Sequence, residues 1–154
     1  MALKGFLKKK IVAFESIDFT KEIEKELKDK NEFVALVLLH AYTENYLKDI
    51  IFYLNKSNKK ATIKPQIYSE ISKVKFPTLC LIYLNLEIID EDLYEKLIEL
   101  NESRNYIVHN LISLNIDDEK SRELLRKEIE NGKKACGKLY SIYQKKLEEC
   151  STVI

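Results

Sequence analysis

Residues 90–114 read DEDLYEKLIELNESRNYIVHNLISL, and this stretch decides how the chain is expected to fold. Leucine and isoleucine recur along it in alternating steps of four and three, which places them on one side of an α-helix: Leu93, Leu97, Leu100, Ile107 and Leu111. Arg104 occupies the position in this stripe where another leucine would be expected. The stretch therefore predicts one long amphipathic helix whose apolar stripe, interrupted by a single arginine, faces a core.

The composition of the whole chain favours helices throughout. Only 3 Gly and 2 Pro occur in 154 residues, and 33% of the residues are charged. An apolar content of 45% is enough for a core, and the length is typical of one domain. We therefore predict a single all-α domain over residues 1–154, an up-and-down helical bundle of four to five main helices. Residues 1–17 are expected as an N-terminal arm or short helix, and residues 151–154 as a frayed end.

Three further helices of this bundle can be placed from their apolar patterns. Residues 20–31 predict a short amphipathic helix. Residues 32–55 predict the most hydrophobic helix, which is apolar on nearly all sides and is therefore expected at the centre of the bundle. Residues 118–149 predict a long final helix with a heptad-like stripe, in which Gly132 allows another backbone to approach closely.

The region between the central helix and the motif helix contains both prolines of the chain. Residues 56–64 are polar and basic and predict a loop. Pro65 and Pro77 are expected to interrupt the helical pattern, with two short helical segments near residues 67–74 and 79–86.

Net charge and cysteine content exclude several classes of function. The chain carries 26 basic and 25 acidic side chains, so any contact with RNA has to be local. Cys80, Cys136 and Cys150 are widely spaced and only 2 His occur, which argues against a zinc site and a disulfide framework. No apolar run is long enough for a signal peptide or a membrane span. We expect reduced thiols, no metal or other cofactor, no membrane contact and a cytoplasmic location.

Arg104 is accompanied by other polar side chains in the same helix. A guanidinium cannot deprotonate in a protein, and an unpaired buried charge is very costly, so Arg104 needs a carboxylate, water or an anionic ligand. A polar strip of Glu102, Asn105 and His109 lies further round the helix, with Asn101 close by. The candidate site residues are therefore Arg104, Asn105 and His109, with Glu102 in support.

Two polar residues interrupt the apolar pattern of the central helix. His40 and Glu44 lie four residues apart and so share one face. In one interpretation His40 is a satisfied core histidine with Glu44 as its partner; in another, Glu44 and Arg104 neutralise each other. We expect Glu44 within salt-bridge distance of Arg104 in the same chain, with His40 one turn away. A metal site here is a poor interpretation, because no second carboxylate and histidine pair completes it.

The sequence ESRNYIVHN at residues 102–110 resembles the signature of the HEPN superfamily. That signature is an Arg followed by a polar residue, usually Asn, Asp or His, with a His after four to six intervening positions. In the family it lies late in a long helix of a four- or five-helix bundle, and many members are metal-independent endoribonucleases. The resemblance implies Arg104 and His109 as the catalytic pair and Asn105 as the supporting polar residue. Beyond this helix it extends only to helix number and order.

The resemblance also implies partners. It implies a homodimer in which two motif helices meet and form one composite cleft for RNA. In toxin members that are paired with a nucleotidyltransferase antitoxin, a Tyr two residues after the His is the modification target, but this position is Leu111 here. We therefore expect a homodimer and RNA as partners, with an antitoxin protein as a further candidate that does not act by this modification.

The residue types suit RNA cleavage, because RNA carries its own nucleophile, the 2′-hydroxyl. Histidine titrates near neutral pH and can transfer the proton, and arginine binds phosphate and stabilises its developing charge. Two other interpretations use the same residues without turnover. In one, the bundle serves dimerisation or partner binding and Arg104 is a structural ion-pair centre. In the other, the cleft is an RNA or nucleotide sensor.

Overall fold

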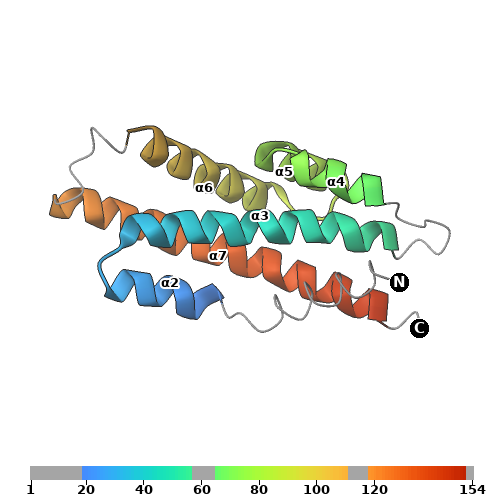
Figure 1. Cartoon of the computed structure of the whole chain (residues 1–154), viewed down its shortest axis with the longest axis horizontal. Coiled ribbons are helices and arrows are strands. Elements are labelled where there is room, and N and C mark those ends of the chain that lie inside the picture. Colours follow the sequence, from blue (N-terminus) through green and yellow to red (C-terminus); the bar gives the residue numbers. More distant parts are fainter. Residues whose placement is uncertain (1–18, 57–64, 111–117, 152–154) are drawn as a thin grey trace.

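The computed structural model describes residues 19–56, 65–110 and 118–151, and its regular elements in these ranges are all helices (Figure 1). They are α2 (Phe19–Lys28), α3 (Glu32–Lys56), α4 (Pro65–Lys73), α5 (Phe76–Asn85), α6 (Glu91–Asn110) and α7 (Glu119–Ser151). The prediction of an all-α bundle is confirmed. The N-terminal arm, most of the 56–64 loop, Leu111 and the end of the chain after Ser151 lie outside the described residues.

Helix α3 lies at the centre of the bundle. It contacts α2, α4, α5, α6 and α7, and its most extensive contact is with α7, which runs beside it in the same direction (Figure 1). Helix α6 runs antiparallel to both. A helix with apolar residues on most sides is stable only when other helices cover it, so the hydrophobicity of α3 explains its central place, as predicted. Among the described helices, none combines the length and apolar content needed to cross a membrane.

Short polar signals fix where the two helices nearest the motif begin. Asp90 caps α6, because its Oδ1 accepts a hydrogen bond from the backbone N–H of Leu93 at 2.8 Å. Asp118 accepts one from the N–H of Ser121 at 3.3 Å at the start of α7. These caps satisfy N–H groups that have no partner within the helix, and they explain why each helix starts directly after an aspartate.

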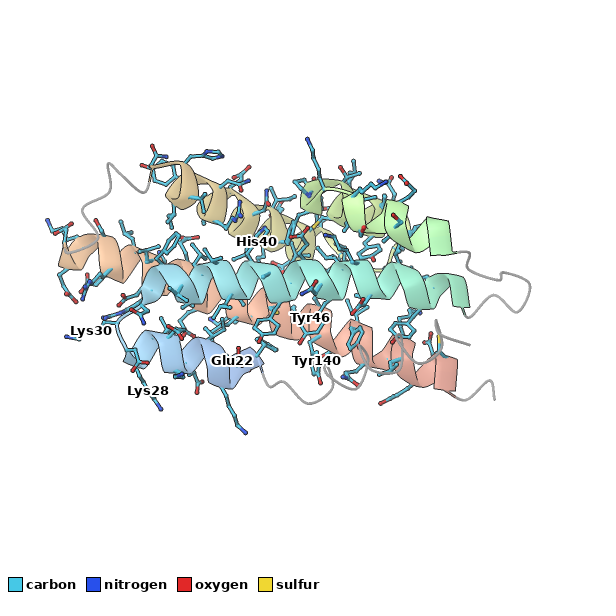
Figure 2. All side chains as sticks on the ribbon, in the orientation of Figure 1. Glu22, Lys28, Lys30, His40, Tyr46 and Tyr140 are labelled. Atoms are coloured by element: carbon cyan, nitrogen blue, oxygen red, sulfur yellow. The ribbon has the colours of Figure 1, made fainter. Side chains whose placement is uncertain are left out.

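The turns after α2 and α5 each contain a residue with positive φ that is not glycine. Lys30 has φ 58° and Glu87 has φ 55° (Lys30 is labelled in Figure 2). In each turn the backbone N–H of the next residue, Asn31 or Ile88, bonds to a carbonyl five residues earlier, at 2.8 and 2.9 Å. These hydrogen bonds offset a conformational cost of roughly 1–2 kcal/mol for a residue with a side chain.

Both prolines lie in the first turn of a helix. Pro65 is the first residue of α4, and Pro77 follows Phe76 in the first turn of α5. A proline fits the first turn, because its missing N–H would have no intrahelical partner there. The predicted break before Pro77 is confirmed, because α4 ends at Lys73 and α5 begins at Phe76, three residues earlier than expected. The residues directly before Pro65 lie outside the described ranges.

Gly132 lies where α7 passes both α3 and α6. A Cβ atom added at this position would lie 2.8 Å from Leu39 Cδ2 and 2.9 Å from Leu100 Cδ1. Both leucines are buried, so they have little room to move aside. The stripe of α7 predicted that another backbone approaches Gly132 closely, but the nearest atoms are leucine side chains from two helices.

We predict that Gly132→Ala and Gly137→Ala change stability in opposite directions. Replacing a glycine inside a helix by alanine stabilises by roughly 0.5–1 kcal/mol, and a Cβ at Gly137 would meet nothing within 4 Å. At Gly132 the same methyl group overpacks the core, which typically costs about 1–3 kcal/mol. Urea unfolding should place Gly132→Ala below the wild type and Gly137→Ala above it. An equal increase in stability for both variants would show that Leu39 and Leu100 can shift to make room for the methyl group, and it would contradict the prediction.

Candidate functional site

Helix α6 carries the whole predicted motif in its last two turns. The apolar stripe is buried as predicted at Leu93, Leu97, Leu100 and Ile107. Arg104 lies in this stripe and is half-buried, whereas Glu102 and His109 are exposed. The arginine therefore reaches water from a position that is anchored in the core.

Arg104 is held by its neighbour Asn105. Its Nη1 donates a hydrogen bond to Asn105 Oδ1 at 2.9 Å. Its Nε is buried and has no hydrogen-bond partner among the described residues, and none of their carboxylates forms a salt bridge with it. A buried donor without an acceptor costs about 1–3 kcal/mol or more when it is charged. The guanidinium therefore keeps an unmet capacity to bind an anion.

The predicted salt bridge between Glu44 and Arg104 is wrong. Glu44 Oε1 accepts a hydrogen bond from Lys48 Nζ at 2.7 Å instead. Lys48 lies one turn further along the same helix, so this pair forms without any requirement on how α3 and α6 are rotated. The carboxylate of the central helix is therefore engaged elsewhere, and Arg104 stays uncompensated by it.

His40 lies on the side of α3 that faces α5 and α6 (Figure 2). It is buried, its Nε2 lies 3.0 Å from Asn101 Oδ1, and its ring stacks on Phe76 with 4.7 Å between centroids. Burial lowers the pKa of His40, and the charge of Arg104 lowers it further, against the opposing effects of the Asn101 hydrogen bond and of Glu44. His40 is therefore a neutral, satisfied core histidine.

The partner of His40 is the residue that sequence reasoning left without a role. Asn101 lies three residues before Arg104, on the same side of α6, and it is buried. That spacing was the available signal, because a polar residue beside an apolar stripe needs a partner on the facing helix. Glu44, the expected partner of His40, acts on it only through its charge.

His109 and Arg104 point in different directions. Successive residues of an α-helix are about 100° apart, so five steps leave the two side chains roughly 140° apart around the axis. Asn105 accepts a hydrogen bond from the arginine and shares one face of the helix with His109, four residues further on. Within one chain, the structure thus joins Arg104 with Asn105 by a hydrogen bond, while His109 lies on the face of Asn105 and away from the arginine.

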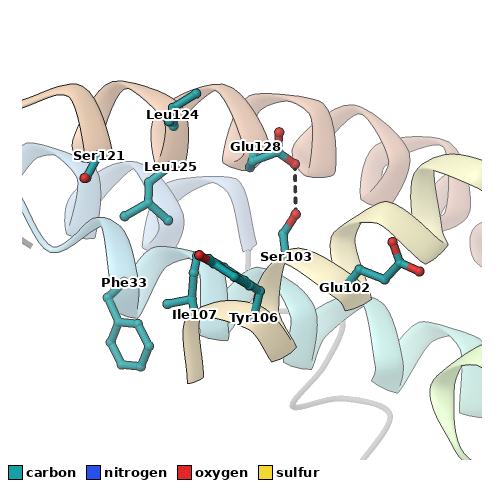
Figure 3. A pocket seen from close by; sticks show the side chains of 9 residues that line it. All are labelled: Phe33, Glu102, Ser103, Tyr106, Ile107, Ser121, Leu124, Leu125 and Glu128. Carbon is teal, nitrogen blue, oxygen red and sulfur yellow. Dashed lines mark hydrogen bonds between the residues drawn. The ribbon is translucent and has the colours of Figure 1, made fainter. Parts of the chain in front are cut away.

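A groove opens beside the motif, between α3, α6 and α7 (Figure 3). Its volume is about 440 Å³, and it is lined by Phe33, Glu102, Ser103, Tyr106, Ile107, Ser121, Leu124, Leu125 and Glu128. Tyr106 is 62% exposed and Leu124 is 66% exposed. Ser103 Oγ donates to Glu128 Oε2 at 2.9 Å and joins α6 to α7 at its floor. Sequence reasoning missed this groove, which three helix ends create together.

The cysteines offer no nucleophile. Cys80, Cys136 and Cys150 are buried free thiols. Burial raises the pKa of Cys80 and of Cys136 to about 12, so both stay protonated at neutral pH. Within the described ranges, no three His, Cys, Asp or Glu side chains gather closely enough to hold a metal ion.

Comparison of the chain with protein-family models, with curated proteins and with solved structures finds no match. The contacts of the α3 and α6 residues and the resemblance of residues 102–110 to the HEPN signature are therefore the grounds for a proposed function.

We predict that His40 makes the free energy of unfolding depend on pH. Its pKa is lower in the folded than in the unfolded chain, so the unfolded chain binds a proton that the folded chain does not. The stability that the fold gains by keeping His40 neutral is fully present above the ordinary pKa of histidine. It is lost as pH falls from there through the lowered pKa of the folded chain. Urea unfolding between pH 8 and pH 5 should show this fall. His40→Gln should flatten it and His109→Gln should not; an unchanged slope in His40→Gln would contradict the assignment.

Proposed function

We propose that this protein is a HEPN-like, metal-independent endoribonuclease in which Arg104 binds the scissile phosphate and His109 transfers a proton. The observation that carries the proposal is the state of Arg104. Its stem is anchored in the core, its Nη1 is oriented by Asn105, and no carboxylate of the described residues neutralises it. An oriented and uncompensated guanidinium is suited to bind phosphate through two parallel hydrogen bonds.

The reaction needs only acid–base chemistry. The 2′-hydroxyl oxygen attacks the adjacent phosphorus, the bond from O2′ to phosphorus forms, and the bond from phosphorus to O5′ breaks. One group removes the proton from the 2′-hydroxyl, and another donates a proton to the departing O5′. Arg104 stabilises the charge on the non-bridging oxygens. The products are a 2′,3′-cyclic phosphate and a 5′-hydroxyl end.

Two copies of the chain supply what one copy lacks. In a single chain His109 points away from Arg104, and one histidine cannot serve as both acid and base in the same step. A homodimer that brings two copies of α6 together offers two histidines to one phosphate. The exposed side chains of Tyr106 and Leu124 beside the motif support such a contact, because large exposed apolar groups mark interaction surfaces.

The alternative in which Arg104 is a structural ion-pair centre has no supporting contact, because the arginine forms no salt bridge with the described residues. An RNA or nucleotide sensor without turnover would use the same guanidinium and would bind RNA without cutting it. A role as a toxin or in phage defence, with an antitoxin protein as partner, is also part of the proposal. It rests on the resemblance to the HEPN signature alone.

We predict that the purified protein cuts single-stranded RNA in the presence of EDTA and leaves cyclic-phosphate ends. Arg104→Ala removes the group that stabilises the transition state and should lower the rate by about 10²-fold or more. His109→Ala should lower it by about 10²–10⁴-fold. Gel analysis of RNA fragments measures both effects, and far-UV circular dichroism checks that the variants stay helical.

The matched control is Lys127→Ala, which removes an exposed positive charge from α7 and should leave cleavage unchanged. Full activity in both Arg104→Ala and His109→Ala would show that the cleavage comes from elsewhere and would refute the proposal. Binding of RNA without cleavage by the wild type would favour the sensor.

We predict a homodimer whose interface includes the groove. Light scattering at micromolar concentration should report about twice 18.1 kDa. Leu124→Glu places a charge on an exposed apolar position beside the groove. It should raise the dissociation constant of the dimer by at least about tenfold. Leu86→Glu, at a position that is 58% exposed on another part of the surface, should leave the dimer intact. A monomeric wild type would remove the composite cleft from the proposal.

A further inference from the structure

The groove between α3, α6 and α7 lies next to the motif on the same helix. Ser103, Tyr106 and Ile107 of α6 line the groove, whereas Arg104 does not. Tyr106 lies three residues before His109, so these two exposed side chains are neighbours on the outer surface of the helix. The groove therefore begins directly beside the histidine of the proposed reaction.

The groove offers an exposed aromatic ring above an apolar hollow. Side chains of α6 form one wall and side chains of α7 the other (Figure 3). Tyr106 is 62% exposed although its ring is large, and such a ring presents a flat surface on which another ring can stack. The volume of about 440 Å³ lies within the range of about 300–1,000 Å³ that is typical of sites for small organic groups.

Two carboxylates line this mostly apolar groove. Glu128 is half-buried and its Oε2 accepts a hydrogen bond from Ser103 Oγ at 2.9 Å, while Glu102 is exposed. Neither carboxylate forms a salt bridge within residues 19–56, 65–110 and 118–151. A carboxylate only accepts hydrogen bonds and has about four sites for them, so Glu128 keeps acceptor capacity beyond its bond with Ser103. The two negative charges repel phosphate, and the groove suits a flat, uncharged group with N–H donors.

We propose that the groove binds one guanine base of the RNA, with the base stacked on Tyr106 and its Watson–Crick edge bonded to Glu128. Guanine carries two adjacent donors on this edge, N1–H and the 2-amino group, and a carboxylate accepts from both. Adenine, cytosine and uracil place an acceptor next to each donor, which a carboxylate repels. The inference rests on the proposed function and adds which nucleotide lies beside the bound phosphate. In the proposed dimer, Leu124 at the rim contacts the second copy, and the groove opens into the cleft that the two copies share.

The arrangement of side chains around α6 relates this base to the site of cleavage. At 100° per residue, His109 lies roughly 140° and Tyr106 roughly 200° from Arg104 around the helix axis. The histidine is therefore between the other two on the exposed surface. An RNA strand with a phosphate on Arg104 and a base on Tyr106 thus crosses the surface that carries His109.

The test measures binding of uridine hexanucleotides in which every 2′-hydroxyl is methylated, so that the nucleophile of the proposed cleavage is blocked. One position carries guanine, hypoxanthine or adenine in place of uracil. Fluorescence anisotropy with the wild-type protein should show that the guanine hexamer binds about fivefold or more tightly than the adenine hexamer. The hypoxanthine hexamer should fall between them, because hypoxanthine lacks the 2-amino donor.

Variants of the two proposed contacts test them separately. Tyr106→Ala should lower the affinity for the guanine hexamer by about fivefold or more, whereas Tyr106→Phe keeps the ring and should bind as the wild type does. Glu128→Gln keeps the size of the side chain and an acceptor for Ser103, but it replaces one carboxylate oxygen by a donor. The preference for guanine over adenine should therefore disappear. Glu123→Gln, at an exposed position of the same helix, is the control and should keep the preference.

The ratio of the guanine and adenine affinities separates this inference from the proposed function. Arg104→Ala should weaken binding of both hexamers and leave the ratio unchanged. Equal affinities in the wild type, an unchanged ratio in Glu128→Gln or full binding by Tyr106→Ala would overturn the inference, even if the motif residues prove essential for RNA cleavage. A preference for guanine that requires Tyr106 and Glu128 would uphold it, even if the wild type cuts no RNA.

Discussion

The meeting of α3, α6 and α7 at Gly132 sets the geometry on which the candidate site depends. The two side chains that fill the space beside this glycine are Leu39 and Leu100. Each immediately precedes one member of the polar pair, His40 or Asn101. The register that lets the leucines share one small space therefore also brings the histidine and the asparagine within hydrogen-bond distance. The packing at Gly132 therefore also fixes the position of Arg104, which lies one turn beyond Leu100.

The two carboxylates of α3 differ in whether their ion-pair partner lies on the same helix or on another one. Glu44 has a lysine one turn away on its own helix, and this contact forms with less ordering than a contact between helices. Glu32, by contrast, is buried at the start of α3 and bonds to Arg126 of α7 at 2.7 Å, which joins the two helices near the groove. Glu32 thus joins two helices, Glu44 pairs within its own helix, and neither carboxylate forms a salt bridge with Arg104.

The apolar periodicity predicted the bounds of the helices closely, because the side of a helix that is buried can be identified from the spacing of its own apolar residues. Helices α3 and α7 begin and end within two residues of the expected positions. Spacing does not encode the rotation of one helix against another. For that reason His40 could be assigned to the interior while its partner, Asn101, could not, and the bridge from Glu44 to Arg104 was expected although Lys48 was nearer. The groove escaped prediction for the same reason.

The dominance of the contact between α3 and α7 has a consequence for the order of events during synthesis. Helix α3 is complete long before its main partner is made, since α4, α5 and α6 are translated in between. Until α7 leaves the ribosome, α3 can be covered only in part, by α2 and the intervening helices, and the face that holds Ala35, Leu39 and Tyr46 lacks its final cover. Nascent chains of this protein therefore expose an apolar face of α3 until α7 is made, and exposed apolar surface of this kind promotes aggregation.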